Sequence, residues 1–379
     1  MTTNRISIVI PSYERPNSLR GVLQYWSNQA VDVIVVDGSD EPLFYTNDHS
    51  LSQNISYYHF PTSIEERLKF ASDHLETDYA CIVADDEILL YSALHKAADI
   101  LATDLSYSAV IGATLGFKQT TNGFYFRGEY LTANELSIDS DEPLFRLNQR
   151  VSVTGNSIFY SLTRSTILQT AIEFIVSNGY SCPYIPEYQM EAILAGAGKV
   201  KVLHDLMWLR NRSGAVITHQ SFDRNIYFYS WMLDPENAKQ LSRLKESFEV
   251  YFGKIAPSAN ISGEYLVNLF SEYEKASISC QRPSSLLVRI GNYIRRSFVE
   301  CLSAIQDLTP SRSFSRWFPA DITFQMLKNA GVPYDSADFM EAMQAFAIVP
   351  SRTKANIHSR FSALLVSWCK NSLGRIRPR

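Results

Sequence analysis

Three carboxylates follow directly on a short apolar run in this chain. Residues 79–83 read Tyr-Ala-Cys-Ile-Val, and after one alanine come Asp85, Asp86 and Glu87. Adjacent carboxylates raise one another's pKa unless a cation lies among them. Because ligands of open α/β sheets bind at the carboxyl ends of the strands, the pattern predicts a buried strand that ends at a site for Mg²⁺ or Mn²⁺ and a substrate phosphate. A solvated junction between strand and loop is the alternative.

The segments before this run alternate between strand and helix patterns. Residues 5–10 and 31–36 are apolar and rich in β-branched side chains, turn-forming residues follow each of them, and residues 54–60 alternate like a strand. Helical spacing of apolar residues follows at 17–26 and 64–75. Strands that are apolar throughout and alternate with helices predict a parallel sheet covered on both faces.

Three motifs in this part of the chain carry a family resemblance. The first strand leads into Pro-Ser-Tyr-Glu-Arg-Pro at 11–16, the second ends in Val-Val-Asp-Gly-Ser at 35–39, and Asp-Tyr at 78–79 opens the acidic motif. In this order and spacing they resemble the nucleotide-sugar-binding half of family-2 glycosyltransferases with the GT-A fold. The second motif is one Asp shorter than the family's. The resemblance covers residues 1 to about 215.

This resemblance implies a fold class and a domain organisation. We expect an α/β catalytic domain of GT-A type at residues 1–221, with a Rossmann-like, mostly parallel sheet and helices on both faces. Residues 222–379 lose the strand pattern, and their apolar spacing predicts a mainly helical C-terminal domain. Its helices are expected at 241–252, 263–277, 284–304, 322–330, 337–347 and 359–373.

The resemblance also implies which residues bind the metal and the donor. Asp86 would hold the cation with Glu87, and Asp85 would lie near the ribose. Asp37 would accept a hydrogen bond from the base, as the family's equivalent Asp does from uracil, so a UDP-linked donor is expected. The remaining donor contacts would be Pro11, Ser12, Tyr13 and Glu14 around the base, and Arg67 near the diphosphate. An ordinary tight turn is the alternative for the first four residues, and a solvated helix face is the alternative for Arg67.

A later segment resembles the part of the family that carries the general base. Residues 186–202 look like the family's Glu-Asp dipeptide, helix, Ala-Gly turn and strand, and Glu187 falls where the family has its catalytic Asp. A Glu has nearly the same reference pKa and can act as a general base, although its carboxylate lies one methylene further out. Glu191 is the fallback, and a Glu that only complements the helix dipole is the alternative. His204 or His219 could add a metal ligand, but a surface role explains each of them too.

Composition and charge bear on partners and location. The last 99 residues hold 14 Lys and Arg against 6 Asp and Glu, a net charge of +8, whereas the chain as a whole carries -4. We expect either packing of the helical domain on the acidic half, possible dimerisation through it, or a peripheral contact with an anionic membrane. Nucleic acid is not expected as a partner. No signal-peptide pattern, no apolar run of spanning length and five scattered cysteines favour a cytoplasmic protein.

The resulting hypothesis is a metal-dependent, inverting glycosyltransferase. It would move a sugar from a nucleotide donor to a glycan or lipid-linked acceptor, in bacterial surface polysaccharide synthesis as the resemblance implies. A sugar-1-phosphate nucleotidyltransferase is one alternative, although its Gly-rich loop is missing from residues 11–16. A non-catalytic nucleotide- or glycan-binding scaffold is the other, because Glu187 replaces the family's Asp.

Overall fold

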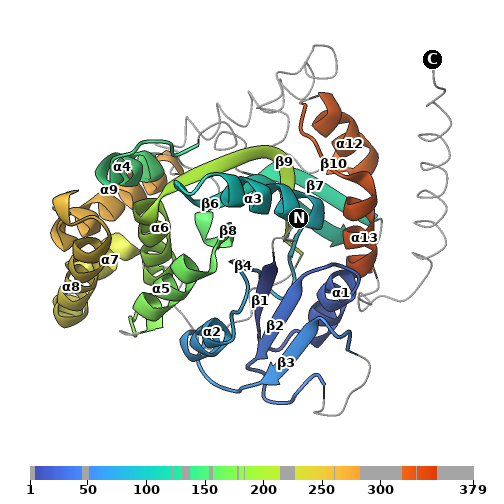
Figure 1. The fold of residues 1–379 in the computed structure, drawn as a ribbon, viewed down its shortest axis with the longest axis horizontal. Helices are drawn as coiled ribbons and strands as arrows, with labels where there is room; N and C mark the ends of the chain where they lie inside the picture. The colour runs from blue at the N-terminus through green and yellow to red at the C-terminus, as the bar shows by residue number, and fades with distance from the viewer. Residues whose placement is uncertain are drawn as a thin grey trace, which may run out of the picture.

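The structure is a computed structural model with a mixed sheet at its centre (Figure 1). Helices lie on both faces of this sheet, and further helices extend from one end. The structure describes residues 5–44, 51–120, 123–129, 137–152, 157–176, 179–182, 184–213, 227–259, 261–281, 318–329 and 331–347.

The first half of the sheet is parallel. Its strands are β1 (Ile6–Ser12), β2 (Asp32–Asp37), β3 (Ile55–His59) and β4 (Tyr79–Ile82), in the spatial order β3-β2-β1-β4. Successive apolar side chains of β1 point to opposite faces, so each strand contributes to two cores. This explains the continuous apolar runs in the sequence, which a strand exposed on one face would not need.

The second half of the sheet contains longer strands and antiparallel pairs. β8 (Leu162–Arg164) joins β4 to β6 (Tyr107–Thr120), and β6 forms a hairpin with β7 (Gly123–Glu129). β9 (Lys199–Asn211) runs parallel to β6 with register shifts. The short strands β5 (Ile88–Leu89) and β10 (Phe318–Pro319) pair with β9 and β7.

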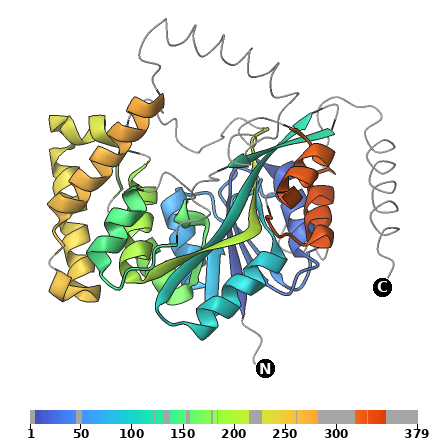
Figure 2. The same cartoon turned by 90° about the horizontal axis from the view of Figure 1, so that it is seen from above.

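The helices form two layers and an extension. One face is covered by α1 (Pro16–Trp26), α3 (Tyr91–Thr103), α12 (Ala320–Asn329) and α13 (Ser336–Ala347). The other is covered by α2 (Ile64–Asp73), α5 (Ser165–Val176) and α6 (Ile185–Ala197). Figure 2 shows the extension at the end opposite to α12 and α13. It comprises α7 (Phe228–Leu233), α8 (Ala238–Ile255) and α9 (Gly263–Gln281), which pack beside α4 (Pro143–Ser152) and α6.

The expected fold class is confirmed: a sheet with a parallel core, helices on both faces and a helical C-terminal region. Four of the expected C-terminal helices are α8, α9, α12 and α13, and the segments 284–304 and 359–373 lie outside the described residues. Buried residues of α13 belong to the same core as β1, and those of α8 and α9 to the core of α6. The boundary at residue 221 stays a prediction about where the chain divides.

Polar contacts link α13 to α1 and to the first turn of α3. Tyr25 donates its hydroxyl to Asp338, and the other Asp338 oxygen accepts from the backbone N–H of Ser92 at 2.7 Å and from its hydroxyl at 2.6 Å.

In the part of the chain that the structure describes, no helix combines the length and apolar character needed to cross a bilayer.

Candidate active site

The acidic group lies where β4 ends, against the turn that follows β1. Asp85 is 5% exposed, and its Oδ2 accepts from the Ser12 hydroxyl at 3.0 Å and the Tyr13 backbone N–H at 3.2 Å. Arg15 Nη1 lies 3.1 Å from Asp85 Oδ1 and 2.9 Å from Asp86 Oδ2. Burial raises the pKa of both carboxyls, that of Asp86 to about 6, while Arg15 opposes the rise. The structure therefore brings Ser12, Tyr13 and the acidic motif together as expected.

Glu87 points in another direction from Asp86. It is 6% exposed, accepts from Trp208 Nε1 at 2.8 Å and lies 3.5 Å from Arg210 Nε. Burial raises its pKa to about 8 although Arg210 lowers it. Glu87 as a metal ligand stays a prediction, and it would require the carboxyl to change these partners.

The fit of a divalent cation can be judged from the donor set. No group of three His, Cys, Asp or Glu side chains within the described ranges could hold a metal. The Asp86 side chain is 14% exposed and next to a buried acid. Mg²⁺ is commonly held by one or two carboxylates together with substrate phosphates and water, so Asp86 fits a cation that arrives with a diphosphate. His204 is exposed on β9, and His219 lies outside the described residues.

Asp37 ends β2 with both carboxylate oxygens bound to protein. Oδ1 accepts from the Ser39 backbone N–H at 3.0 Å and its hydroxyl at 2.6 Å, and Oδ2 accepts from the Tyr57 hydroxyl at 2.6 Å. Burial and this last bond raise the pKa of Tyr57. Because Asp37 is only 1% exposed, it holds the turn in this structure, and its contact with a base stays a prediction.

The turn after β1 is held in an unusual conformation. Glu14 has a φ of 52°, its N–H donates to the Ser39 hydroxyl at 2.8 Å, and its Oε1 accepts from the Asp40 N–H at 2.9 Å. Residues in the left-handed region often occur at ligand sites, where the surrounding structure imposes the strain. Pro11 and Tyr13 beside it are half-buried. The predicted wall of the base pocket is therefore a rigid turn.

Arg67 contacts the turns that follow β1 and β2. It is 2% exposed and donates to the carbonyls of Ser12 and, at 3.4 Å, Ser63. It also packs on Gly38, where an added Cβ would lie 2.7 Å from the guanidinium carbon. Burial lowers the pKa of Arg67, and the negative charges of Asp37 and Asp85 oppose this decrease. Its contact with a diphosphate stays a prediction, because the buried guanidinium already donates to backbone carbonyls.

Glu187 lies in the first turn of α6, beside a second carboxylate. Its Oε1 is 3.0 Å from the Ser157 hydroxyl, which is also 2.8 Å from Glu191 Oε1. Glu191 is 4% exposed and forms an ion pair with Arg150 of α4. Glu187 is exposed to solvent, yet protein surrounds it on several sides; this desolvation and the Glu191 charge raise its pKa.

Arg210 connects the acidic motif with Glu187. It stacks over the Trp208 ring at 4.8 Å and lies 3.5 Å from Glu87 and 3.9 Å from Glu129. Its charge lowers the pKa of both Asp86 and Glu187. Arg210 therefore influences the protonation of both the acidic motif and the candidate base.

A cluster of ion pairs between residues of β7 and β9 lies next to Arg210. Arg212 binds both oxygens of Glu129 at 2.8 and 2.7 Å, and Arg127 donates to it at 2.8 Å. Burial raises the pKa of Glu129, but these bonds hold it below its ordinary value. On the other side of the indole, the Tyr160 ring stacks on Trp208 with centroids 4.3 Å apart.

Sequence reasoning missed several of these residues. Arg15 stands inside the motif at 11–16, so its partnership with the acids could have been considered. Arg210 belongs to β9 and pairs with Gly116, and no motif of the sequence analysis includes it. Arg150 and Glu129 gave no signal, since each acquires its role only through contacts with distant segments.

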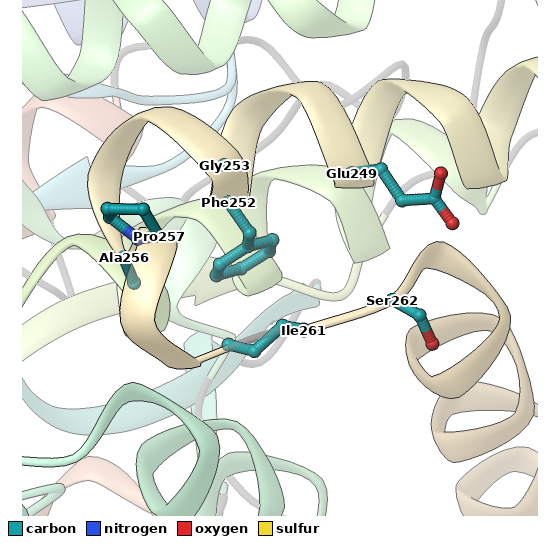
Figure 3. Close-up of a pocket in the computed structure, with 7 residues that line it drawn as sticks. All are labelled: Glu249, Phe252, Gly253, Ala256, Pro257, Ile261 and Ser262. Atoms are coloured by element: carbon teal, nitrogen blue, oxygen red, sulfur yellow. The ribbon is translucent and has the colours of Figure 1, made fainter.

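A separate pocket lies at the end of α8, away from the carboxyl edge of the sheet (Figure 3). It has a volume of about 320 Å³ and is lined by Glu249, Phe252, Gly253, Ala256, Pro257, Ile261 and Ser262. Its one carboxylate, Glu249, is exposed and accepts from the Gly263 N–H at 3.1 Å. The pocket offers no second ionisable group for catalysis.

Comparisons with known proteins give only distant structural matches. No protein-family model and no curated protein sequence matches the chain. Among solved structures, a chain of S. aureus TarS matches with 15% identity and a TM-score of 0.41 over 67% of this chain, which spans 44% of that TarS chain. Structures of TarS 1-349 with UDP-GlcNAc and with UDP match at 14% and 12% identity, with TM-scores of 0.43 and 0.44. Each of these two matches covers 71% of this chain. The match covers 80% of the TarS chain in the UDP-GlcNAc complex and 70% of the TarS chain in the UDP complex. Function is therefore argued from the residues of this chain.

Proposed function

We propose that this protein is an inverting glycosyltransferase that moves a sugar from a nucleotide-sugar donor, with UDP favoured, to a glycan or lipid-linked acceptor. The observation that carries the proposal is the position of Arg210. It contacts Glu87 of the acidic motif, and its charge acts on both Asp86 and Glu187. The acidic motif and the candidate base thus both lie within the electrostatic influence of one arginine.

The reaction needs two kinds of charged group. As the glycosidic bond breaks, negative charge grows on the leaving diphosphate, and preorganised positive groups stabilise it. Arg15 and Arg210 are the cations of the described residues that lie at the acidic motif. A Mg²⁺ or Mn²⁺ ion held by Asp86, when bound, would add Lewis-acid stabilisation of the same charge.

The second requirement is a base for the acceptor. The acceptor hydroxyl attacks the anomeric carbon and must lose its proton. Glu187 is exposed, so an acceptor can reach it, and its raised pKa brings it closer to neutral pH, where a general base works best. Glu191 is buried and paired with Arg150, so it suits this task less.

A screen of nucleotide sugars tests the proposal. The full chain is incubated with single nucleotide sugars, with and without Mn²⁺, and thermal unfolding and nucleotide release are followed. A donor at 100 times its Kd should add about 2.7 kcal/mol to the free energy of unfolding. Stabilisation by a nucleotide sugar together with nucleotide release supports the proposal. Binding without any turnover in the presence of glycan and lipid-linked acceptors would instead support a non-catalytic scaffold.

A further inference from the structure

Arg15 lies between the two aspartates of the acidic motif. Its Nη1 is 3.1 Å from Asp85 Oδ1 and 2.9 Å from Asp86 Oδ2. One nitrogen therefore bridges an oxygen of each carboxylate, as a cation shared by the two acids would. Mg²⁺ binds its oxygen ligands at about 2.0–2.1 Å, so an ion bound to both of these oxygens could not share the space with Nη1.

The surroundings of the acids make the Arg15 side chain the partner that can move. Asp85 is 5% exposed, and its Oδ2 is held by the Ser12 hydroxyl and the Tyr13 backbone N–H. The side chains of Arg15 and Asp86 are 16% and 14% exposed, so solvent reaches both. The Arg15 backbone is held at the start of α1, where its carbonyl accepts a hydrogen bond from the first turn. Arg15 can therefore release the acids by rotation of its side chain alone.

The balance of charge gives such a release a direction. Without a donor, the guanidinium offsets part of the repulsion between Asp85 and Asp86. A diphosphate that binds beside Asp86 adds negative charge, which favours a divalent cation at the acids and offers the guanidinium a new partner. Arginine suits this partner, because its planar fork matches phosphate oxygens in a bidentate manner.

We propose that Arg15 bridges Asp85 and Asp86 in the donor-free protein and leaves them for the diphosphate when a nucleotide and a divalent cation bind together. Arg15 thereby couples cation binding to nucleotide binding, and the free protein binds the cation alone only weakly. This inference rests on the proposed function, which supplies the nucleotide-sugar donor.

The coupling between the two ligands distinguishes this exchange from a general effect of charge. In the exchange, Arg15 opposes the cation only while no nucleotide is bound, so its removal strengthens Mn²⁺ binding only without UDP. A general loss of positive charge would strengthen Mn²⁺ binding equally with and without UDP. A purely structural role would weaken it in both cases, because the acids would no longer be held in place.

The experiment measures Mn²⁺ binding to the full chain by electron paramagnetic resonance at constant ionic strength. Titrations are made without nucleotide and with saturating UDP, and are corrected for the Mn²⁺ that UDP binds in solution. Without UDP, Arg15→Gln should bind Mn²⁺ about tenfold more tightly than wild type, a change of about 1.4 kcal/mol. With UDP it should bind Mn²⁺ no more tightly than wild type, so the factor by which UDP strengthens Mn²⁺ binding should fall about tenfold.

Arg5→Gln is the matched control. It removes the same group from an exposed ion pair with Asp32, at the opposite end of β1 from the acidic motif. Neither Mn²⁺ affinity should change in this variant. If Arg15→Gln does not fold, Arg15→Met, which keeps the apolar stem of the side chain, replaces it with the same expected result.

The outcomes separate this inference from the proposed function. Unchanged or weaker Mn²⁺ binding by Arg15→Gln without UDP overturns the inference, and so does an equal gain with and without UDP. Failure of wild type and variant alike to bind Mn²⁺ overturns it too. Sugar transfer by the wild type in any of these cases keeps the proposed function. A tenfold fall of the coupling factor in a chain that transfers no sugar would support the exchange and refute the proposed function.

Discussion

Two pairs of acidic residues, Asp85 with Asp86 and Glu187 with Glu191, have the same chemical groups in different surroundings. Asp85 and Asp86 both contact one guanidinium, that of Arg15, and Asp85 also accepts from Ser12 and Tyr13. In the second pair, within the described residues, Arg150 pairs with Glu191, and Glu187 is linked to Glu191 through a serine hydroxyl. The first pair lies beside one shared arginine, whereas the second combines a buried, paired Glu191 with a Glu187 that is exposed to solvent.

This difference indicates a division of work. Carboxylates that share a cation are suited to binding another cation or a substrate group, while an exposed carboxyl with a raised pKa can be reached by an acceptor and is suited to proton transfer. Role is thus assigned by environment and not by residue type. The predictions that follow test this division, from the largest expected effect to the smallest.

Replacing Asp86 should have the largest effect. Asp86→Ala should lower sugar transfer roughly 10³-fold, because Lewis-acid stabilisation is worth several kcal/mol and each 1.36 kcal/mol is tenfold in rate. Mn²⁺-dependent nucleotide binding should be lost while the fold stays intact, since a repelling charge is removed. Transfer rates and Mn²⁺ titrations check this. Asp73→Ala, which removes an exposed acid at the end of α2, is the control, and full wild-type activity in EDTA would contradict the metal assignment.

Replacing Glu187 should have the next largest effect. Glu187→Gln keeps shape and polarity but cannot accept a proton, so transfer should fall roughly 10²-fold or more at unchanged donor affinity. Glu191→Gln should lose much less. Initial rates at saturating donor measure both variants. A reversed order would identify Glu191 as the base, and no loss in either variant would refute the inverting mechanism.

Replacing Asp37 should affect stability as well as binding. Asp37→Asn turns one acceptor into a donor that faces Ser39 or Tyr57, and a buried mismatch of this kind costs about 1–3 kcal/mol of unfolding free energy. UDP affinity should fall more than Mn²⁺ affinity, because the turn lines the expected base pocket. Tyr57→Phe, which removes one bond only, should cost about 1 kcal/mol in the same denaturant titration. Unchanged stability in both variants would show that the turn does not depend on these bonds.

The pH dependence should show the smallest effect. Because the pKa of Glu187 is raised, it stays protonated to a higher pH than an ordinary Glu, whose pKa is about 4.3. The turnover rate should therefore rise with pH through a midpoint above that value. In Glu191→Gln the like charge is gone, and the midpoint should move to lower pH. A midpoint that does not move would show that Glu191 does not act on the base.

The parallel half of the fold could be predicted because its signals are local. Continuous apolar runs in β1, β2 and β4 mark strands buried on both faces, and the acids that follow them lie at the sheet edge by geometry alone. The position of Asp85 near Ser12 follows from the pairing of β1 with β4.

The other half of the site depends on pairings that no local pattern shows. β9 mixes charged and apolar residues and pairs with β6 through register shifts, which places Arg210 beside Gly116. Ser157 reaches Glu187 because the short 3-10 helix that follows it, Ile158–Tyr160, packs on α6. For the same reason sequence reasoning could name Glu187 but not the arginines whose charges act on its pKa.

The most direct test of the division between the two acidic pairs measures two quantities on the same variants. Donor Kd in the presence of Mn²⁺ and the single-turnover transfer rate at saturating donor are determined for wild type, Asp86→Ala and Glu187→Gln. We predict that Asp86→Ala loses donor affinity, and that Glu187→Gln binds donor as wild type does and loses roughly 10²-fold or more in rate. If Glu187→Gln loses donor affinity and keeps its transfer rate, the two pairs do not divide binding from proton transfer, and the account is wrong.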